Sequence, residues 1–482
     1  MEFPVNRRRF LGSSAGSLGA LALTHLLQAS GEASESDGTV PSDGTVPSDR
    51  TVSPLLARQP HHTPRAKAVI CLFQHGGPSQ MDLFDPKPAL TRYRGRRFPG
   101  ELETHNIEHM GGILGSPFKF QKCGQSGISL SKLLPHTSQI ADEFTLIRSM
   151  TTESNDHEFA VRLFHSGKTF PGRPVLGSWV VYGLGTENQN LPAYVVLADE
   201  GGLPLIEAQN WTAGFLPAIC QAAPIRHASN PVLYLNRPDK VSARARQNQL
   251  HFLKELNQAH LRQNSGNSEL EARISNFELA ARMQTSVPEA LDINSETAAT
   301  QRMYGLDNPA TADYGRRCLM ARRLVERGVR FVQLFLHKQP WDTHTQNNKV
   351  VSELSSEIDQ PSAALVMDLK RRRLLDSTMV LWTGEFGRTP TVEGKDGRDH
   401  NRHGFSLWIA GGGFKKGYAH GQTDEFGYRA VEDVVRVPDL HATMLHALGI
   451  DHARLSYPFE GRNTSLTDPD VTKAKVIHKL LA

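Results

Sequence analysis

Short runs of consecutive apolar residues recur along the chain, separated by segments whose apolar positions follow a helical spacing. Uninterrupted apolar runs, unlike alternating ones, are typical of strands that are covered on both faces. We therefore predict buried strands at Ala68–Phe73, Phe144–Met150, Ala193–Ala198, Arg330–Leu336, Thr378–Trp382 and Ser406–Ala410.

Two of these predicted strands directly follow a predicted helix. Arg316–Arg327 carries apolar side chains at helical spacing, and Gly328 is a natural end for that helix before the next strand begins. Val351–Arg372 precedes the strand at Thr378–Trp382 in the same way. Strands that alternate with helices form a mostly parallel sheet between layers of helices. The pattern therefore predicts an α/β fold.

Residues 241–301 have a different character. They are polar and helical in pattern, with Leu250, Leu253 and Leu256 on one face. We expect a helical insertion within a single large domain that spans residues 65–475.

The N-terminus has the layout of a signal peptide. In residues 1–33, Arg7 and Arg8 precede a weakly apolar, Gly-rich stretch that is too short and too polar for a membrane span. Residues 34–64 contain a Pro-, Gly- and Asp-rich repeat with little apolar surface, which predicts a disordered linker. We expect the twin-arginine translocase to export the folded protein, so that it is periplasmic or secreted.

Composition and motifs exclude several function classes. The 54 basic and 50 acidic residues nearly balance, so we expect no nucleic-acid partner. The four cysteines form no CxxC pair, which excludes a zinc ribbon, and either disulfides or buried free thiols fit their spacing. The predicted domain contains no P-loop, GxGxxG or GxSxG motif, which argues against nucleotide binding and a serine-hydrolase triad.

Reactive side chains follow the ends of the predicted strands or precede the last one. In open parallel sheets, ligands bind beyond the carboxyl ends of the strands, so we expect these side chains to converge. Histidine and carboxylate groups together are the ligands that Zn²⁺ or Mn²⁺ prefers, which predicts a site for one or two divalent ions. The candidate metal ligands are His75, Asp342, His344, Glu385 and His400, with Asp82, Asp399 and His403 as weaker alternatives.

Each candidate ligand also has a purely structural interpretation. Glu385 leaves an apolar strand into a glycine-flanked turn, where an unpaired charge is unfavourable. Asp342 and His344 point the same way if their segment is extended; otherwise they are a helix cap and a surface histidine. Arg388 is a candidate for binding an anionic substrate or an ordinary solvated arginine. Ser79, in the glycine-rich turn after the first strand, is a candidate catalytic residue.

Ordered motifs over residues 65–470 resemble a known family. They include His75-Gly76-Gly77-Pro78-Ser79, Trp341-Asp342-Thr343-His344, Gly384-Glu385-Phe386-Gly387-Arg388 and Gly397-Arg398-Asp399-His400. Together they resemble the domain-of-unknown-function 1501 (DUF1501) family, a sulfatase-like family of planctomycete-type bacteria. The resemblance implies the alkaline phosphatase and sulfatase fold, with a metal site at the strand ends.

The resemblance also implies roles for particular residues, and the sequence departs from the superfamily pattern at several of them. His75 or Gln74 stands where the superfamily has a metal-binding aspartate. Glu385 replaces the aspartate of the Asp-His-Gly turn, and the histidine of that turn is a phenylalanine here. The late histidine ligand corresponds to His400 or His403.

The position of the superfamily's nucleophile falls on His157, ten positions before Gly167. A histidine can be a nucleophile, a metal ligand or a general base, but it cannot become a formylglycine. The resemblance therefore implies that the usual sulfatase mechanism does not apply.

These observations predict an exported metal-dependent hydrolase of phosphate or sulfate esters with an unconventional nucleophile. Its partner would be an anionic ester substrate, either a polysaccharide or a small molecule. The alternative is a non-catalytic metal-binding or interaction protein that retains the fold.

Overall fold

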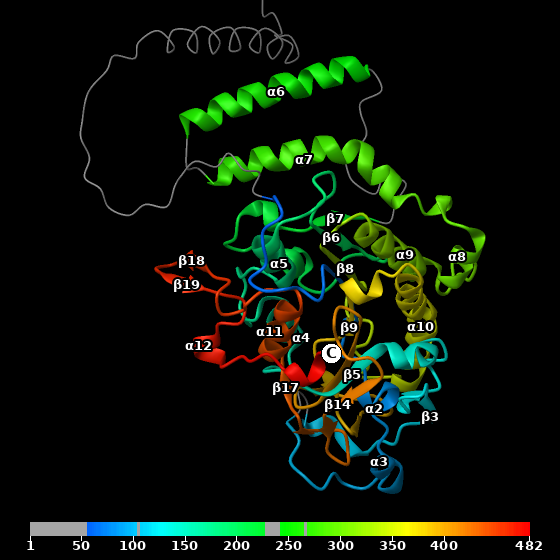
Figure 1. Cartoon of the computed structure of the whole chain (residues 1–482). Coiled ribbons are helices and arrows are strands. Elements are labelled where there is room, and N and C mark those ends of the chain that lie inside the picture. Colours follow the sequence, from blue (N-terminus) through cyan, green and yellow to red (C-terminus); the bar gives the residue numbers. More distant parts are fainter. Residues whose placement is uncertain (1–54, 104–106, 227–241, 265–267) are drawn as a thin grey trace, which may run out of the picture. The chain divides into compact units, whose positions relative to one another are not determined.

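The computed structural model describes residues 55–103, 107–226, 242–264 and 268–482 (Figure 1). The predicted signal peptide and residues 34–54 of the predicted linker lie outside the described residues. No described helix combines the length and the apolar character needed to cross a membrane.

Residues 55–64, which we assigned to the linker, lie against the folded chain. Leu55 is buried, and the Arg58 backbone N–H donates to the Leu184 carbonyl at 2.9 Å. The His61 backbone N–H donates to the Gly449 carbonyl at 2.8 Å. The ordered chain therefore begins before Arg65, because these backbone groups find partners at the ends of two helices.

The core is one large, mostly parallel sheet. All of its strands run in one direction except β13, which is antiparallel to both of its neighbours. In spatial order the strands are β14 (Tyr418–His420), β5 (Phe144–Thr151), β13 (Phe405–Ala410), β9 (Thr378–Thr383), β1 (Ala68–Phe73), β8 (Phe331–Phe335), β6 (Tyr194–Leu197) and β7 (Ala223–Ile225), and β17 (Val435–Arg436) also pairs with β5.

Every apolar run that we predicted to be a strand lies in this sheet. The residues of β1, β6, β8, β9 and β13 are all buried, which agrees with strands covered on both faces. The predicted α/β class with a mostly parallel central sheet is confirmed.

Helices bury apolar faces in the same hydrophobic core as the strands. Those that contribute to it include α4 (His157–Ser166), α5 (Leu176–Leu184), α9 (Ala312–Glu326), α10 (Asn347–Arg371) and α11 (Val437–Ala447). The predicted helices at Arg316–Arg327 and Val351–Arg372 are α9 and α10, which each begin four residues earlier than predicted. Four other described helices are short: α2 (Gln80–Leu83), α3 (Pro88–Arg92), α8 (Ala298–Met303) and α12 (Pro469–Thr472).

The loops around the main sheet contain small two-stranded sheets. They are β2 (Met110–Ile113) with β11 (Thr391–Glu393), β3 (Phe120–Cys123) with β4 (Ile128–Ser131), β10 (Gly387–Arg388) with β12 (His400–Asn401), β15 (Gln422–Thr423) with β16 (Ala430–Glu432), and β18 (Tyr457–Phe459) with β19 (Arg462–Thr464). The pair of β10 and β12 matters for the site, because it places Arg388 directly opposite His400.

The predicted helical insertion forms two long helices, α6 (Ala243–Gln263) and α7 (Ser268–Leu291), which lie side by side (Figure 1). The helix α7 buries Met283, Val287 and Ala290 in the main core. The large apolar side chains Phe252, Leu253 and Leu256 of α6 stay exposed. The insertion is therefore anchored through α7.

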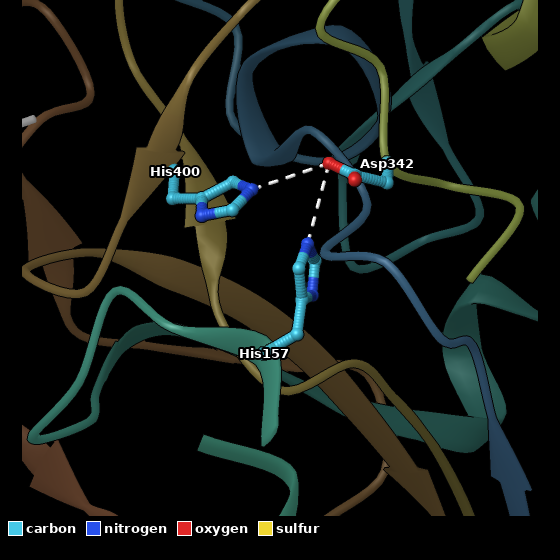
Figure 2. Close-up of side chains that lie close together, drawn as sticks. All are labelled: His157, Asp342 and His400. Atoms are coloured by element: carbon cyan, nitrogen blue, oxygen red, sulfur yellow. Dashed lines mark hydrogen bonds and ion pairs between the residues drawn. The ribbon is translucent and has the colours of Figure 1, made fainter. Parts of the chain in front are cut away.

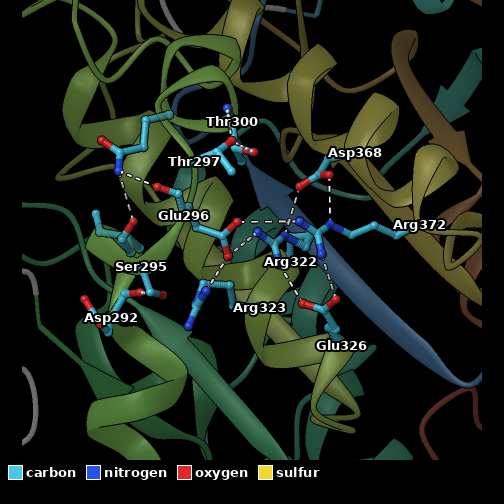
Figure 3. A network of polar contacts seen from close by, with 12 residues as sticks. Asp292, Ser295, Glu296, Thr297, Thr300, Arg322, Arg323, Glu326, Asp368 and Arg372 are labelled. Carbon is cyan, nitrogen blue, oxygen red and sulfur yellow. Dashed lines mark hydrogen bonds and ion pairs between the residues drawn. The ribbon is translucent and has the colours of Figure 1, made fainter.

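A network of ion pairs fixes the end of the insertion to two long helices (Figure 3). Its centre is the buried Arg322 of α9, whose guanidinium lies 2.7 Å from Glu296, 2.6 Å from Glu326 and 2.9 Å from Asp368. Since Asp368 belongs to α10 and Glu296 lies between α7 and α8, the network joins three separate parts of the chain.

Glu296→Gln is expected to lower the free energy of unfolding by about 1–3 kcal/mol, because it removes the charge that Arg322 and Arg323 share. Denaturant unfolding measures this change. Glu289→Gln is the matched control, because Glu289 is exposed and its ion pair is with Arg327 alone. Equal stability of the two variants would contradict a structural role of the network.

The four cysteines are free thiols and all are buried. Burial raises the pKa of the thiols of Cys71 and Cys318 well above the ordinary value, and that of Cys220 to about 12. The structure thus favours the buried-thiol alternative over disulfides.

Candidate metal centre

Four predicted site residues meet at the carboxyl edge of the sheet. His157 opens α4 after β5, while Asp342 and His344 follow β8. His400 lies on β12, just before the antiparallel strand β13 begins. The topology brings these loops together because β13 runs against its neighbours, so that its start lies at the same edge as their ends.

Three imidazoles point at a single carboxylate oxygen, and Figure 2 shows two of them, His157 and His400. The Nε2 atoms of His157, His344 and His400 lie 3.3, 3.1 and 3.2 Å from Asp342 Oδ1. The Nε2 atoms of His344 and His400 are 2.9 Å apart. One oxygen has too few lone pairs to accept a hydrogen bond from each of these rings and from Arg388, which also reaches it at 2.7 Å.

The other ring nitrogen of each histidine faces an oxygen acceptor. An acceptor at Nδ1 holds the proton of a neutral imidazole there and leaves the Nε2 lone pair free for an ion. The acceptors are Glu385 Oε1 for His157 (2.6 Å), the Asn155 carbonyl for His400 (2.6 Å) and Glu393 Oε2 for His344.

The donor set fits a divalent ion. Donor atoms of His157, Asp342 and His400 lie within 4.8 Å of one another, and so do those of His344, Asp399 and His400. Ligands about 2.1 Å from a tetrahedral Zn²⁺ are roughly 3.4 Å apart, close to the separations between these nitrogens and the carboxylate. Imidazole and carboxylate donors also suit Mn²⁺. The site therefore has the chemistry and the spacing of a metal centre.

Electrostatics within the group keep Asp342 ionised. Burial raises the pKa of Asp342, but contact with the three histidines and the Arg388 charge lower it far below the usual range. Asp342 and Glu385 raise the pKa of His157 against the opposing effect of burial. Burial dominates at His400 and lowers its pKa to about 4.

Arg388 is fully buried beside this group. Its guanidinium donates to the Gly76, Gly77 and Arg398 carbonyls as well as to Asp342. We predicted that Arg388 would bind an anionic substrate or be solvated. It is not solvated, and its donors are engaged in joining loops, so substrate binding by Arg388 stays a prediction without support from its geometry.

Glu385, a predicted ligand, stands behind His157 instead of beside Asp342. Its Oε1 accepts hydrogen bonds from His157 and, at 2.8 Å, from the Gly76 backbone N–H. Burial raises the pKa of Glu385, but contact with His157 more than offsets this effect and the pKa is lowered. In this geometry Glu385 orients His157, which is itself a candidate ligand.

His75, another predicted ligand, lies outside the group around Asp342. It is fully buried, and its ring packs against Phe73 and Phe335 with centroids 4.6 and 5.3 Å away. Neither ring nitrogen has a hydrogen-bond partner among the described residues. Burial lowers the pKa of His75 to about 4, so the ring is neutral at pH 7.

Asp82 forms a buried ion pair with Arg398, and Ser79 donates a hydrogen bond to it. The Ser79 hydroxyl donates to Asp82 at 2.7 Å, and Arg398 Nε donates to the same carboxylate oxygen at 2.9 Å. Asn347 Nδ2 adds a third hydrogen bond at 3.1 Å. Asp82 is thus fully engaged in holding loops together, and the predicted catalytic role of Ser79 has no geometric support.

The two remaining candidates lie on either side of His400. Asp399 accepts a hydrogen bond from the His400 backbone N–H at 2.7 Å and belongs to the second donor group. His403 faces Glu103 at 3.0 Å and packs against Tyr428, away from Asp342. Of the two histidines left open for the late ligand, the structure brings His400 to the site.

Glu393 is a residue of the candidate site that the sequence analysis missed. It lies on β11, 49 positions from His344, and no motif joins the two residues. Two glycines also hold the ligand loops close. A Cβ on Gly76, where φ is +106°, would lie 2.4 Å from the Asp342 nitrogen, and one on Gly397 would lie 1.8 Å from the His344 carbonyl oxygen. Only the folded chain reveals these contacts.

Glu393→Gln is expected to weaken metal binding about 10- to 100-fold, because it removes the carboxylate that orients His344. Titration of the metal-free protein with Zn²⁺, followed by calorimetry, measures the affinity. Glu353→Gln changes an exposed glutamate on α10 and should leave the affinity unchanged. An unchanged affinity in Glu393→Gln would exclude His344 as a ligand held by Glu393.

A family profile matches residues 66–481, and its description reads "Protein of unknown function (DUF1501)". The chain belongs to the DUF1501 family. The resemblance inferred from the ordered motifs is thereby confirmed, and the DUF1501 match includes every residue of the metal centre. A search of curated protein sequences found no significant match.

Solved structures similar to this DUF1501 chain include members of the sulfatase and alkaline phosphatase superfamily. A phosphonate monoester hydrolase from Silicibacter pomeroyi is 10% identical, with 86% of this chain and 76% of that chain covered and a TM-score of 0.34. The PsFucS1 sulfatase from Pseudoalteromonas sp. is 12% identical over 80% and 68%, with a TM-score of 0.32. An alkaline phosphatase superfamily protein from Vibrio parahaemolyticus is 9% identical over 89% and 74%, with a TM-score of 0.36.

Proposed function

We propose that this DUF1501 protein is an exported metal-dependent hydrolase of phosphate or sulfate esters. The observation that carries the proposal is the convergence of three imidazole Nε2 atoms on Asp342 Oδ1, with each Nδ1 facing an oxygen acceptor. That arrangement presents free nitrogen lone pairs to one position, which is what a divalent ion requires.

The cluster of three histidines and Asp342 is shielded from solvent on one side and accessible to it on the other. The side chains of His157 and His400 are 8% and 6% exposed, whereas those of Asp342 and His344 are 17% and 32% exposed. A substrate therefore approaches from the side of His344. When bound, a divalent ion at such a set supplies Lewis-acid polarisation of an ester oxygen and lowers the pKa of a coordinated water.

The chain's own residues prepare this position for an anionic ester. Glu385 and Glu393 fix the orientation of His157 and His344, and Arg388 holds Asp342 in place. His157 occupies the position of the superfamily's nucleophile, but its Nε2 faces Asp342. In this geometry His157 would help to hold the ion, which would leave water as the attacking group.

A hydrolysis assay tests the proposal. Its substrates are aryl phosphates, phosphate diesters, phosphonate esters and aryl sulfates, since the resemblance implies phosphate or sulfate esters. The purified protein is loaded separately with Zn²⁺ and Mn²⁺, and metal content is measured beside turnover. Metal-dependent turnover of one ester class supports the proposal. Stoichiometric metal without turnover on any ester would contradict it.

The second candidate is a metal-binding protein without catalysis. Two observations favour it: the nucleophile position holds a ligand, and the donors of Arg388 are engaged within the protein. Metal bound at one equivalent without turnover is its expected signature, so the same experiment separates the two candidates.

Export belongs to the proposal as well. We expect the twin-arginine translocase to carry the folded protein to the periplasm or beyond, because Arg7 and Arg8 open a signal-like segment. This route suits a protein whose ion binds during folding in the cytoplasm. Replacing both arginines by lysine should retain the protein in the cytoplasm, as cell fractionation would show.

A further inference from the structure

The outer face of α6 exposes an apolar stripe that no described part of the chain covers. Phe252, Leu253 and Leu256 are 58%, 49% and 43% exposed. Phe252 and Leu256 are four positions apart, so they lie on the same face of the helix. Exposed apolar groups gathered on one helix face mark an interaction surface.

The stripe is not the face that builds the domain core. The neighbouring helix α7 supplies that contact through Met283, Val287 and Ala290, which are buried in the main hydrophobic core. The helix α6 lies beyond α7, at the outer side of the insertion (Figure 1). None of the residues that the structure describes therefore has to move for a partner to reach the stripe.

Basic side chains border the stripe on both sides. At about 100° per residue, Arg244 and Arg262 lie together along one edge of the Phe252–Leu256 line, and Arg246 lies along the other edge. Three of the four basic residues of the helix border the stripe, and Lys254 lies on the opposite side. The single acidic residue, Glu255, lies on the same edge as Arg244 and Arg262, so the borders carry a formal charge of +2. Long basic side chains on both sides of an apolar stripe can reach lipid phosphates while the stripe enters the membrane interface.

We propose that α6 binds an anionic lipid surface through the stripe of Phe252, Leu253 and Leu256 and its basic borders. A helix of 21 residues, about 31 Å long, can lie flat in the headgroup region with this face inward. A second copy of the chain is disfavoured as the occupant, because pairing through this face would bring together two surfaces that each carry a formal charge of +2. Binding there would hold the metal centre at a membrane.

Vesicle sedimentation of the full chain tests the proposal, with vesicles of phosphatidylcholine alone and vesicles containing about 30% phosphatidylglycerol. Tighter binding to the anionic vesicles is expected. The double variant Phe252→Gln/Leu256→Gln should weaken it at least about tenfold. Arg244→Gln and Arg262→Gln should each weaken it about fivefold. Circular dichroism establishes that each variant is folded.

Matched controls separate α6 from the rest of the chain. Leu203→Gln removes an exposed leucine elsewhere, and Lys349→Gln removes an exposed charge on α10, so both should bind as the wild type does. Residues 1–33 are identical in all variants, so they cannot cause a difference in binding between one variant and another. The proposal would be overturned if the Phe252→Gln/Leu256→Gln variant bound anionic vesicles as tightly as the wild type. It would also be overturned if the wild type formed a dimer in lipid-free solution and this variant did not.

Discussion

Asp342→Asn is expected to abolish tight metal binding and reduce metal-dependent hydrolysis to background. One carboxylate oxygen of Asp342 is the common neighbour of three imidazole nitrogens. Replacing the carboxylate by an amide therefore removes a negative charge that is in direct contact with all three rings. Loss of a group that merely orients a ligand costs about 10- to 100-fold in affinity, so loss of a ligand should cost at least 100-fold. Metal analysis after dialysis measures the loss.

Asp376→Asn is the control for this experiment, because Asp376 is 81% exposed and its ion pair is with Lys416. It should retain one equivalent of metal and full turnover. If Asp342→Asn kept its metal, the ion would have to bind elsewhere, and the buried His75 and the unpaired Oε2 of Glu385 would be the next candidates.

Asp82→Ala is expected to lower the free energy of unfolding by about 3–5 kcal/mol, the largest loss of stability predicted for this protein. Asp82 and Arg398 are fully buried and paired at 2.9 Å, so the substitution leaves a buried guanidinium without its counter-ion. The double variant Asp82→Ala/Arg398→Met should be less destabilised, because no unpaired charge remains. Denaturant unfolding compares both, and an effect of Asp82→Ala below about 1 kcal/mol would contradict the role of the pair.

The effect of Asp82→Ala should also depend on pH. Burial raises the pKa of Asp82, but the Arg398 charge and hydrogen bonds from Ser79 outweigh burial and lower it below the ordinary value. A carboxyl whose pKa is lowered by folding contributes stability above its unfolded pKa of about 3.9, and this contribution disappears as the pH falls through the folded pKa. The stability difference between wild type and variant should therefore be constant from pH 7 to 5 and shrink below about pH 4.

The strands were predictable because a strand buried on both faces consists of consecutive apolar residues, and such a run is visible in the sequence itself. The run Ala68–Phe73 was identified to the residue, and the helix before Val329 was recovered as α9. Gln333 shows the limit of such patterns: it sits in the middle of the buried strand β8, where its side chain accepts a hydrogen bond from Tyr194 at 2.5 Å. The sheet's order and its single antiparallel strand depend on pairings between distant segments.

The site was predictable only in part. The rule that ligands gather at the carboxyl ends of parallel strands correctly brought Asp342, His344 and His400 together. It could not rank residues at the same edge: Glu385 also lies there, but it contacts the Nδ1 atom of His157 and does not face Asp342. It also overlooked Glu393, which comes from a small two-stranded pair outside the main sheet.

The sequence by itself determined the fold class, the family and the residue types of a metal site, because periodicity and ordered motifs are properties of neighbouring positions. Tertiary structure alone decided which atoms meet. It placed His157, expected as a nucleophile, a ligand or a general base, against Asp342. It also buried Arg388 against backbone carbonyls and left His75 among phenylalanines. Metal ligation depends on sub-ångström placement of atoms from segments more than 200 positions apart, such as His157 and His400, and no local pattern encodes that distance.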